Sequence, residues 1–405
     1  MYGKSKTYGK PYNPHVEETK KKMSPIVALV ALGVLAIIFA IPTLSGSTSG
    51  TGTTVTIKDS SLTLHQGGTV LGSAKGGNLR FGAKNPALIV EDYSQRNQFT
   101  IRIITDLDQQ SKEGSDEKPS FHALFTEGTL VRDPTTGRFS VEWGRTDKLV
   151  SKHNEAGRGM ELSELIMYNS RLFTVEDRTG IVYEILDFQG PSPYVVPRLI
   201  TSEGDGDTDK GMKLEWATVR NGELWLGSFG KEYTRPDGSV LNRNNLWVIV
   251  ADAAGRTRHL DWTPQYKALE RAAGAHPDGY LIHEAINWSD ILQKWVVLPR
   301  RVSKDPYDEV ADEKHGANLL LLASEGFDEV RAAPVGRLTP ERGFSTFKFV
   351  PGTQDQVIVA IKSEENAELD TQSSWITVFT LDGDILLDET EIPGGVKYEG
   401  LEFIL

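Results

Sequence analysis

The chain has 405 residues, of which 39% are hydrophobic and 25% are charged, and this composition is typical of a globular protein rather than a disordered or fibrous one. Its 56 acidic and 44 basic residues give a net charge of −12, which argues against nucleic acid as a partner, because nucleic-acid binding requires a basic face. The sequence contains no cysteine, which excludes thiolate catalysis, iron–sulfur clusters and disulfide bonds.

The N-terminal part divides into a basic tail, 1–23, and an apolar segment, 24–44. Residues 25–44 carry no charge, and twenty such residues suffice for a helix to cross roughly 30 Å of hydrocarbon. The tail has a net charge of +4, which predicts that it stays in the cytoplasm. We therefore predict a signal anchor. A cleaved signal peptide and a buried core helix are the alternatives, and the SGSTSG stretch at 45–50 offers a cleavage site for a secreted form.

Residues 45–96 are rich in Gly, Ser and Thr and show little hydrophobic periodicity. This composition predicts a flexible stem on the lumenal side of the membrane. Within it, residues 54–72 have some strand character.

From residue 97 onwards, short runs of β-branched and aromatic residues alternate with turn sequences. The turns are at 133–137, 176–180, 235–239, 351–355 and 381–384. This alternation is typical of antiparallel hairpins and predicts an all-β domain over residues 97–405. One segment, 266–274, has a helical pattern, and we expect it to decorate a loop.

Four segments of this domain align with one another, each with a small or acidic leading residue, a strand, a turn and a second strand that ends in a charge. A fifth copy is divided, because KYEGLEFIL supplies its leading residue at the C-terminus and TIRIITDLD supplies its second strand at the other end of the domain. The leading residues are Ser163, Glu215, Glu284, Ser345 and Glu399. The charged ends are Asp177, Lys231, Arg300 and Lys362, with Asp106 and Asp108 in the divided copy.

Five such repeats predict a five-bladed β-propeller whose last blade is closed by strands from both ends of the domain. The first strand of each blade would line the central channel, so we expect the five leading residues to converge on one axis. Three carboxylates packed there with two hydroxyls would repel one another without a counter-ion. Calcium accepts six to eight oxygen ligands in irregular geometry and fits this set better than magnesium. The alternative is that these residues merely end their strands.

Further charges flank the leading residues and the charged ends, namely Arg158, Glu161, Glu164 and Arg178. Cations around a bound metal would pair with phosphate oxygens of a substrate, and a carboxylate such as Asp106 or Glu164 would hold the attacking water. The pattern indicates metal-assisted hydrolysis of a phosphoanhydride. The alternative is that each charge forms only a salt bridge within its own turn.

Other motifs give weaker signals. Residues 203–211 are similar to a calcium loop, but Lys210 stands where glycine is needed, so we interpret them as a surface turn. The sequence has no GxxxxGK[ST], GxSxG or HExxH motif, which leaves P-loop, serine-hydrolase and zincin interpretations without support. One glycosylation sequon begins at Asn287, on a predicted inner strand, where we expect no glycan.

The motifs of residues 100–405 resemble, in chain order, those of the soluble calcium-activated nucleotidase family, the apyrases. Those that carry the resemblance include IITDLD, GRGMELSELI, EDRTGIVYEI, KGMKLEW, GFSTFKF, IVAIKSEE and VKYEGLEFI. The resemblance leaves out the tail, the apolar segment and the stem. It implies a five-bladed propeller with a single central calcium ion.

The resemblance also implies roles for individual residues. The family's calcium ligands match Ser163, Glu164, Glu215, Glu284, Ser345 and Glu399. Vertebrate members usually have Asp at the position of Glu164, so the charge is kept here on a longer side chain. Among the residues that match substrate contacts of the family, we expect a part in the reaction for Asp106, Glu161, Glu164 and Arg300. We expect substrate binding by Arg178, Lys231 and Lys362, and also by Asp108 at the end of the divided copy.

The activity that the resemblance implies is calcium-dependent hydrolysis of nucleoside di- and triphosphates with release of phosphate. Membrane-anchored members favour UDP and GDP and serve the Golgi, whereas members from blood-feeding arthropods are secreted and favour ADP and ATP. With its predicted anchor, this chain is expected to be a single-pass type II membrane protein that removes UDP in the Golgi or ER lumen. Activity on ADP and the oligomeric state, a homodimer included, stay open.

Two other classes of function fit a propeller. A carbohydrate-processing enzyme could use two axial carboxylates as acid and base or nucleophile, although the surrounding Arg and Lys residues argue against it. A non-catalytic interaction propeller would bind a protein partner and would need no metal.

Overall fold

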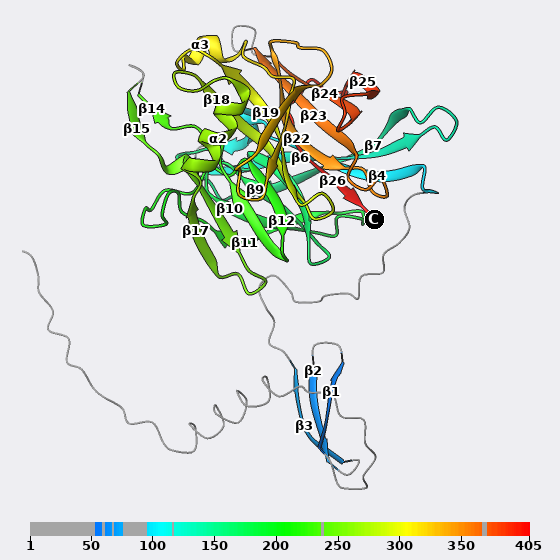
Figure 1. Cartoon of the computed structure of the whole chain (residues 1–405). Coiled ribbons are helices and arrows are strands. Elements are labelled where there is room, and N and C mark those ends of the chain that lie inside the picture. The colour runs from blue at the N-terminus through cyan, green and yellow to red at the C-terminus, as the bar shows by residue number, and fades with distance from the viewer. Residues whose placement is uncertain are drawn as a thin grey trace, which may run out of the picture. The chain divides into compact units, whose positions relative to one another are not determined.

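The computed structural model describes residues 95–115, 117–235, 239–366 and 371–405, together with three strands nearer the N-terminus (Figure 1). These strands, β1 (Thr53–Lys58), β2 (Ser61–Gln66) and β3 (Thr69–Lys75), form a sheet in that order within the predicted stem. The cytoplasmic tail and the anchor predicted at 24–44 lie outside the described residues. Among the helices that are described, none is long and apolar enough to cross a membrane.

The domain that begins at residue 95 consists of five antiparallel blades, each with four main strands. Blade 1 contains β8 (Leu162–Tyr168), β9 (Arg171–Glu176), β10 (Ile181–Leu186) and β11 (Tyr194–Ile200). Blade 2 contains β12 (Trp216–Arg220), β13 (Glu223–Gly227), β16 (Trp247–Ala251) and β17 (Thr257–Asp261). Blade 3 contains β18 (Tyr280–Ser289), β19 (Lys294–Ser303), β20 (Leu319–Ser324) and β21 (Val330–Pro334). Blade 4 contains β22 (Arg342–Phe349), β23 (Val357–Asn366), β24 (Thr371–Thr380) and β25 (Ile385–Glu391).

Blade 5 is built from both ends of the domain. It contains β26 (Tyr398–Ile404), β4 (Gln98–Thr105), β6 (Lys118–Arg132) and β7 (Phe139–Ser151), and the short β5 (Lys112–Ser115), which follows η2 (Asp108–Ser111), also pairs with β6. The C-terminal strand lies beside the first strand of the domain, red against cyan in Figure 1, with Leu401 opposite Ile103. The predicted closure by strands from both ends is therefore confirmed, and it leaves the ring without an open edge.

The first strand of each blade forms the inner wall of the ring. Each of β8, β12, β18 and β22 contacts the first strand of the next blade, and β26 contacts β8, which closes the circle. Since these are the strands that the repeat placed at the channel, the five-bladed propeller predicted from the sequence is confirmed.

Five clusters of buried apolar side chains hold the blades together, one at each junction between neighbouring blades. Between blades 2 and 3, for example, Trp225 packs edge-on against Trp295, with ring centres 5.5 Å apart. Because each blade buries both of its faces, most central strands are apolar in near-continuous runs rather than in alternation, as β16 (WVIVA) illustrates.

The connections between strands follow the predictions closely. All five predicted turns join neighbouring strands, although residues 236–238 of one of them lie outside the description. The expected helix is α2 (Thr263–Ala273), which ends at Gly274 in a left-handed conformation with φ of 74°.

Two connections are longer than a turn and contain secondary structure of their own. Blade 2 carries an inserted hairpin of β14 (Tyr233–Thr234) and β15 (Val240–Asn242), followed by η3 (Asn244–Leu246). Blade 3 carries an insertion with the short helix α3 (Glu309–Asp312). Both insertions join the second strand of a blade to its third, and the two blades are neighbours in the ring.

Candidate active site

The five leading residues are buried at the inner wall. Ser163, Glu284, Ser345 and Glu399 lie on first strands, and Glu215 directly precedes β12, where its backbone N–H donates to the carbonyl of Gly227 at 2.8 Å. The carboxylates of Glu215, Glu284 and Glu399 line one pocket of about 750 Å³. The convergence expected from the repeat is thus present for these three carboxylates, whereas Ser163 and Ser345 do not line the pocket.

Antiparallel pairing also explains why the charged ends reach the same place. The end of each second strand lies beside the beginning of the first strand, so that the N–H of Asp177 donates to the carbonyl of Glu161 and the N–H of Asp106 donates to that of Lys397, both at 3.1 Å. Charges that follow second strands therefore line the pocket formed by the leading residues. These include Asp106, Asp177 and Lys231, and Arg300 adds a charge from within β19.

Arg300 joins three of the leading residues. Its Nη1 pairs with the Glu284 carboxylate, lies 2.7 Å from Oε1 of Glu399 and lies 3.4 Å from Oγ of Ser345. Its Nη2 lies 3.0 Å from Oε2 of Glu365. One guanidinium nitrogen therefore occupies a position that oxygen atoms from blades 3, 4 and 5 surround.

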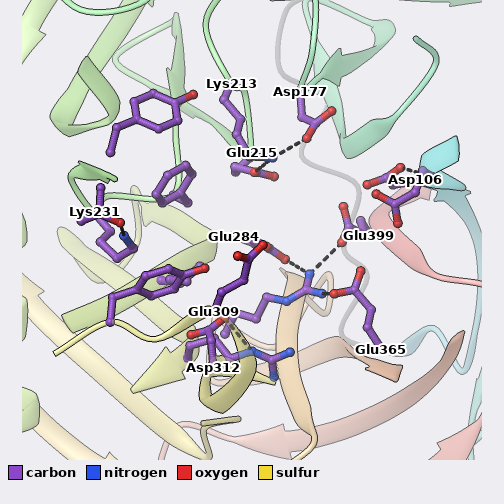
Figure 2. Close-up of a pocket in the computed structure, with 18 of the residues that line it drawn as sticks. Asp106, Asp177, Lys213, Glu215, Lys231, Glu284, Glu309, Asp312, Glu365 and Glu399 are labelled. Carbon is purple, nitrogen blue, oxygen red and sulfur yellow. Dashed lines mark hydrogen bonds and ion pairs between the residues drawn. The ribbon is translucent and has the colours of Figure 1, made fainter. Parts of the chain in front are cut away.

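The other two leading residues differ in their partners. Nζ of Lys213 lies 2.6 Å from Oε1 of Glu215 and also pairs with Asp177 (Figure 2). The Ser163 hydroxyl is fully buried and has no hydrogen-bond partner among the described residues. A buried hydroxyl without a partner is costly, so this oxygen on β8 is available to a ligand.

A second group consists of Asp106 and Asp108, which line the pocket, and Glu161, which is buried beside them and does not line it. Oxygen atoms of Asp106, Asp108 and Glu161 all lie within 4.8 Å of one another. Nζ of Lys397 lies 2.7 Å from Asp106 Oδ2 and 2.9 Å from Asp108 Oδ2, and Nε of Arg158 donates to Glu161 at 2.8 Å. The predicted reaction residues Asp106 and Glu161 are thus brought together, each with a cation of its own.

Burial changes the acidity of these groups. It raises the pKa of Glu215 and Glu399 to about 8 and that of Glu284 to about 7, although neighbouring cations oppose the shift. Burial likewise raises the pKa of Asp106 to about 6, against the effect of Lys397. Because the pKa values of Glu215, Glu284 and Glu399 lie near physiological pH, a divalent cation bound among them would favour their ionised forms.

Glu164 lies elsewhere. Because adjacent residues of a strand point to opposite sides, its carboxylate turns away from the pocket, accepts a hydrogen bond from Thr346 Oγ1 at 2.9 Å and lies 3.5 Å from Nζ of Lys348. Burial raises its pKa to about 7. The structure therefore gives no support to the expectation that Glu164 holds the attacking water, whereas Asp106 does line the pocket.

The predicted substrate-binding residues are divided between two places. Asp108, Arg178 and Lys231 line the pocket. Lys362 does not line it, because its ammonium pairs with Glu389 Oε1 at 2.7 Å and faces a separate pocket of about 300 Å³. Lys362 is therefore not in a position to contact a substrate in the central pocket directly.

Comparison with known proteins identifies the family. Residues 107–404 match the sequence profile of the apyrases. The chain belongs to the apyrase family. It is 46% identical over 308 residues to "Soluble calcium-activated nucleotidase 1" of Rattus norvegicus, covering 76% of this chain and 74% of that protein. It is 36% identical over 337 residues to "Apyrase" of Cimex lectularius, covering 82% and 90% of the two chains.

Some charged residues of this apyrase site escaped the sequence analysis, namely Lys213, Lys397 and Glu365. A signal for two of them was present, because Lys213 and Lys397 each stand two positions before a leading glutamate. Residues two apart in an extended segment face the same side, so both lysines, which precede first strands, should have been expected beside their glutamates.

The oxygen atoms at the axis of this apyrase suit a hard divalent cation. Carboxylates and hydroxyls are its preferred ligands, no nitrogen or sulfur ligand is offered by the leading residues, and Ser163 presents an oxygen without a partner. The residues present therefore fit a calcium ion, with Ser163, Glu215, Glu284, Ser345 and Glu399 as the set from which its ligands would come.

Proposed function

We propose that this protein hydrolyses nucleoside di- and triphosphates in a calcium-dependent reaction that releases phosphate. The observation that carries the proposal is the meeting of Glu284, Ser345 and Glu399 around one cationic atom of Arg300, beside a pocket large enough for a nucleotide. Membership of the apyrase family and the name of the rat relative, a calcium-activated nucleotidase, support the same reaction and the same metal.

The five leading residues would hold the calcium ion. When bound, calcium supplies a positive charge that polarises a phosphate oxygen and neutralises charge that develops during hydrolysis. Arg300, Lys213 and Lys397 surround the same place and pair with carboxylates of the pocket. These three cations give the pocket the means to bind a polyanion, because ammonium and guanidinium groups pair strongly with phosphate oxygens.

Asp106 is the best-placed residue to orient water. It lines the pocket, and its raised pKa makes it able to accept a proton near neutral pH. In the step that we propose, a water oxygen attacks the terminal phosphorus, the bond from that phosphorus to the bridging oxygen breaks, and the proton of the water passes to Asp106. Lys397 holds the carboxylate in place at 2.7 Å.

We further propose that the substrates are mainly UDP and GDP and that the protein acts in the secretory pathway as a type II membrane protein. The charge-free run at 25–44 and the basic tail before it support this location. A cleaved, secreted form and a homodimer both stay compatible with the proposal.

A substrate panel tests the function. We would measure phosphate release from UDP, GDP, ADP and their triphosphates in calcium, in magnesium and with a chelator. We expect release from diphosphates in calcium and none with the chelator. Hydrolysis of aryl glycosides instead would point to a carbohydrate-processing enzyme, and the absence of any hydrolysis would point to an interaction propeller.

A further inference from the structure

Four of the leading residues share a backbone feature that the repeat did not predict. On β8 the pairing register passes from Leu162 to Glu164, which leaves Ser163 without a partner on β9. The registers of blades 3, 4 and 5 leave out one residue of the first strand in the same way, namely Glu284, Ser345 and Glu399. Each of these residues is therefore the extra residue of a β-bulge, a feature that redirects a side chain. Whatever holds the bulges in shape also decides where these side-chain oxygens lie.

The residues that follow two of these bulges bond to each other. Glu164 follows the bulge on β8, and Thr346 follows the bulge on β22. Oγ1 of Thr346 donates to the Glu164 carboxylate and lies 2.9 Å from both of its oxygens. Both side chains are fully buried. The bond joins blades 1 and 4, which are not neighbours in the ring, because the inner strand β26 of blade 5 contacts both β8 and β22.

Gly400 allows this contact across β26. It follows the bulge at Glu399, and a Cβ atom at this position would lie 2.7 Å from the carbonyl carbon of Glu164 and 2.7 Å from the backbone nitrogen of Leu165. Non-bonded atoms do not approach so closely, so only glycine lets β8 pack directly against β26 here. The residues after three of the bulges are thus in contact in turn, from Gly400 to Glu164 and from Glu164 to Thr346.

The two hydroxyl residues at the bulges depend on this contact to different degrees. The Ser345 hydroxyl has a side-chain partner, because its Oγ lies 2.6 Å from Oγ of Ser363 on β23. The Ser163 hydroxyl has no hydrogen-bond partner among the residues that the structure describes. The backbone of its bulge alone therefore sets the position of Ser163, and the next residue on that backbone is Glu164.

Stability alone gives no reason for a charge at this place. Nζ of Lys348, which is also buried, lies 3.5 Å from Oε1 of Glu164. Lys348 stands two positions after Thr346 on β22 and so faces the same side of the strand. A buried ion pair is often no more stabilising than apolar residues of the same size. Directional bonds between β8 and β22, by contrast, hold the two strands at a defined separation.

We propose that Glu164 and Thr346 are positioning residues of the calcium site, which hold Ser163 and Ser345 at the separation that the ion requires. This inference rests on the proposed function, because it needs a calcium ion among the leading residues. Neither Glu164 nor Thr346 lines the pocket, so both act through the bulges and not through contact with the substrate.

The test removes the hydroxyl of Thr346 and measures calcium binding. We would determine the Kd for calcium by titration calorimetry without nucleotide, and the melting temperature in chelator, for the wild type, Thr346→Val and Thr346→Ser. We expect Thr346→Val to raise the Kd about ten-fold, since it loses a hydrogen bond to a charged group at nearly unchanged volume. Thr346→Ser keeps the hydroxyl and should stay within about two-fold of the wild type. Thr346→Ala repeats the test without a branched side chain if Thr346→Val does not fold.

Thr377→Val is the matched control. Thr377 is a buried threonine on β24, outside the inner wall, and its Oγ1 donates to the carbonyl of Leu387 at 2.8 Å. This variant should lower the melting temperature in chelator about as much as Thr346→Val does and should leave the Kd for calcium unchanged.

Each outcome supports or overturns the inference. An unchanged Kd in a folded Thr346→Val overturns it. Equal weakening of calcium binding in Thr346→Ser or in Thr377→Val also overturns it, because a general loss of packing would then explain the effect. If the wild type itself binds no calcium, the proposed function is at fault and the inference falls with it.

Discussion

The Arg300 guanidinium is buried and contacts oxygen atoms of four side chains, three of which are carboxylates. Those carboxylates keep the guanidinium ionised, since they hold the pKa of Arg300 well above its usual value despite burial. At the scale of single residues, the chemistry of this site depends on such cations, which neutralise the axial carboxylates and also offer positive charge to a substrate.

Replacing Arg300 should therefore affect both stability and activity. We predict that Arg300→Gln lowers kcat/KM for UDP by roughly 100-fold, the scale expected when one preorganised cation is lost from a reacting centre. Without calcium the variant should also melt earlier, because Glu284 and Glu399 lose their partner. Steady-state kinetics and thermal melts check both effects, with Arg138→Gln, which breaks an exposed ion pair, as the control. Full activity of the variant would remove Arg300 from the site.

Lys213 provides a second test at this scale. Its ammonium neutralises Glu215, a predicted calcium ligand, and a divalent cation must compete with it. We predict that Lys213→Met tightens calcium binding by about ten-fold, as measured by titration calorimetry without nucleotide, which is the effect of roughly one favourable charge pair. Lys267→Met, which breaks a comparable pair with Glu270 outside the pocket, should leave the affinity unchanged. Weaker binding in Lys213→Met would show that the lysine supports the site instead.

Among the elements, β26 has two structural roles, because it is both the inner strand of blade 5 and the closing strand of the ring. Some of its side chains pack in the core and others line the pocket. Tyr398 and Leu401 pack in the cluster between blades 4 and 5, whereas Glu399 points to the axis. Closure and the metal site thus depend on the same seven residues.

The closing strand should be sensitive to small cavities. Leu401 is fully buried, so Leu401→Ala is predicted to lower the free energy of unfolding by about 3 kcal/mol, from the lost transfer free energy and the cavity left behind. Equilibrium denaturation measures this change. Leu338→Ala, at a side chain that is half exposed, should cost little, and an equal cost at the two positions would argue against a closing role for β26.

The sequon on β18 gives another test of an element. The Asn287 amide is buried, and its Nδ2 donates to the carbonyl of Phe347 on the neighbouring inner strand at 2.8 Å. We predict that protein secreted by eukaryotic cells carries no glycan there, because the amide is inaccessible in the folded protein. Mass spectrometry before and after endoglycosidase treatment checks this. A mass shift mapped to Asn287 would contradict the position of β18 at the channel.

For the whole molecule, a central ion would contact residues from all five blades at once. A ligand that binds only the folded protein stabilises it, by about 2.7 kcal/mol at one hundred times its Kd. We predict that saturating calcium raises the melting temperature and that a chelator reverses the change. A melting temperature that does not respond to calcium would mean that the axial site is absent, even if the propeller is correct.

Much of the architecture was predictable from the sequence because it is encoded locally and repeatedly. The turns at 133–137 and 381–384 and the helix at 266–274 depend on neighbours in the chain. The repeat of leading residue, strand, turn and charged end then predicted the blades and their order, since a hairpin pairs residues that are close in sequence. The closure by both ends of the domain was predictable because the fifth copy of the repeat is divided between them.

The candidate site was predictable only in part. The leading residues were found because they occupy equivalent places in each repeat, and Asp106, Lys231 and Arg300 were found because the repeat placed a charge near the end of each second strand, although Arg300 lies within β19. Glu164 was expected at the pocket and lies outside it, since its neighbour Ser163 already takes the channel-facing position and the carboxylate bonds to Thr346, 182 positions away.

The sequence by itself determined a five-bladed ring and the residues nearest its axis, because hairpin periodicity and repeat spacing are properties of short stretches. Only the tertiary structure decided the partners of each charge, such as Arg300 with Glu399 across 99 positions, and the hydrogen bonds of Thr346 that join blades 1 and 4. Such contacts join side chains from different blades, and their choice depends on packing and on the loss of water around all the groups at once.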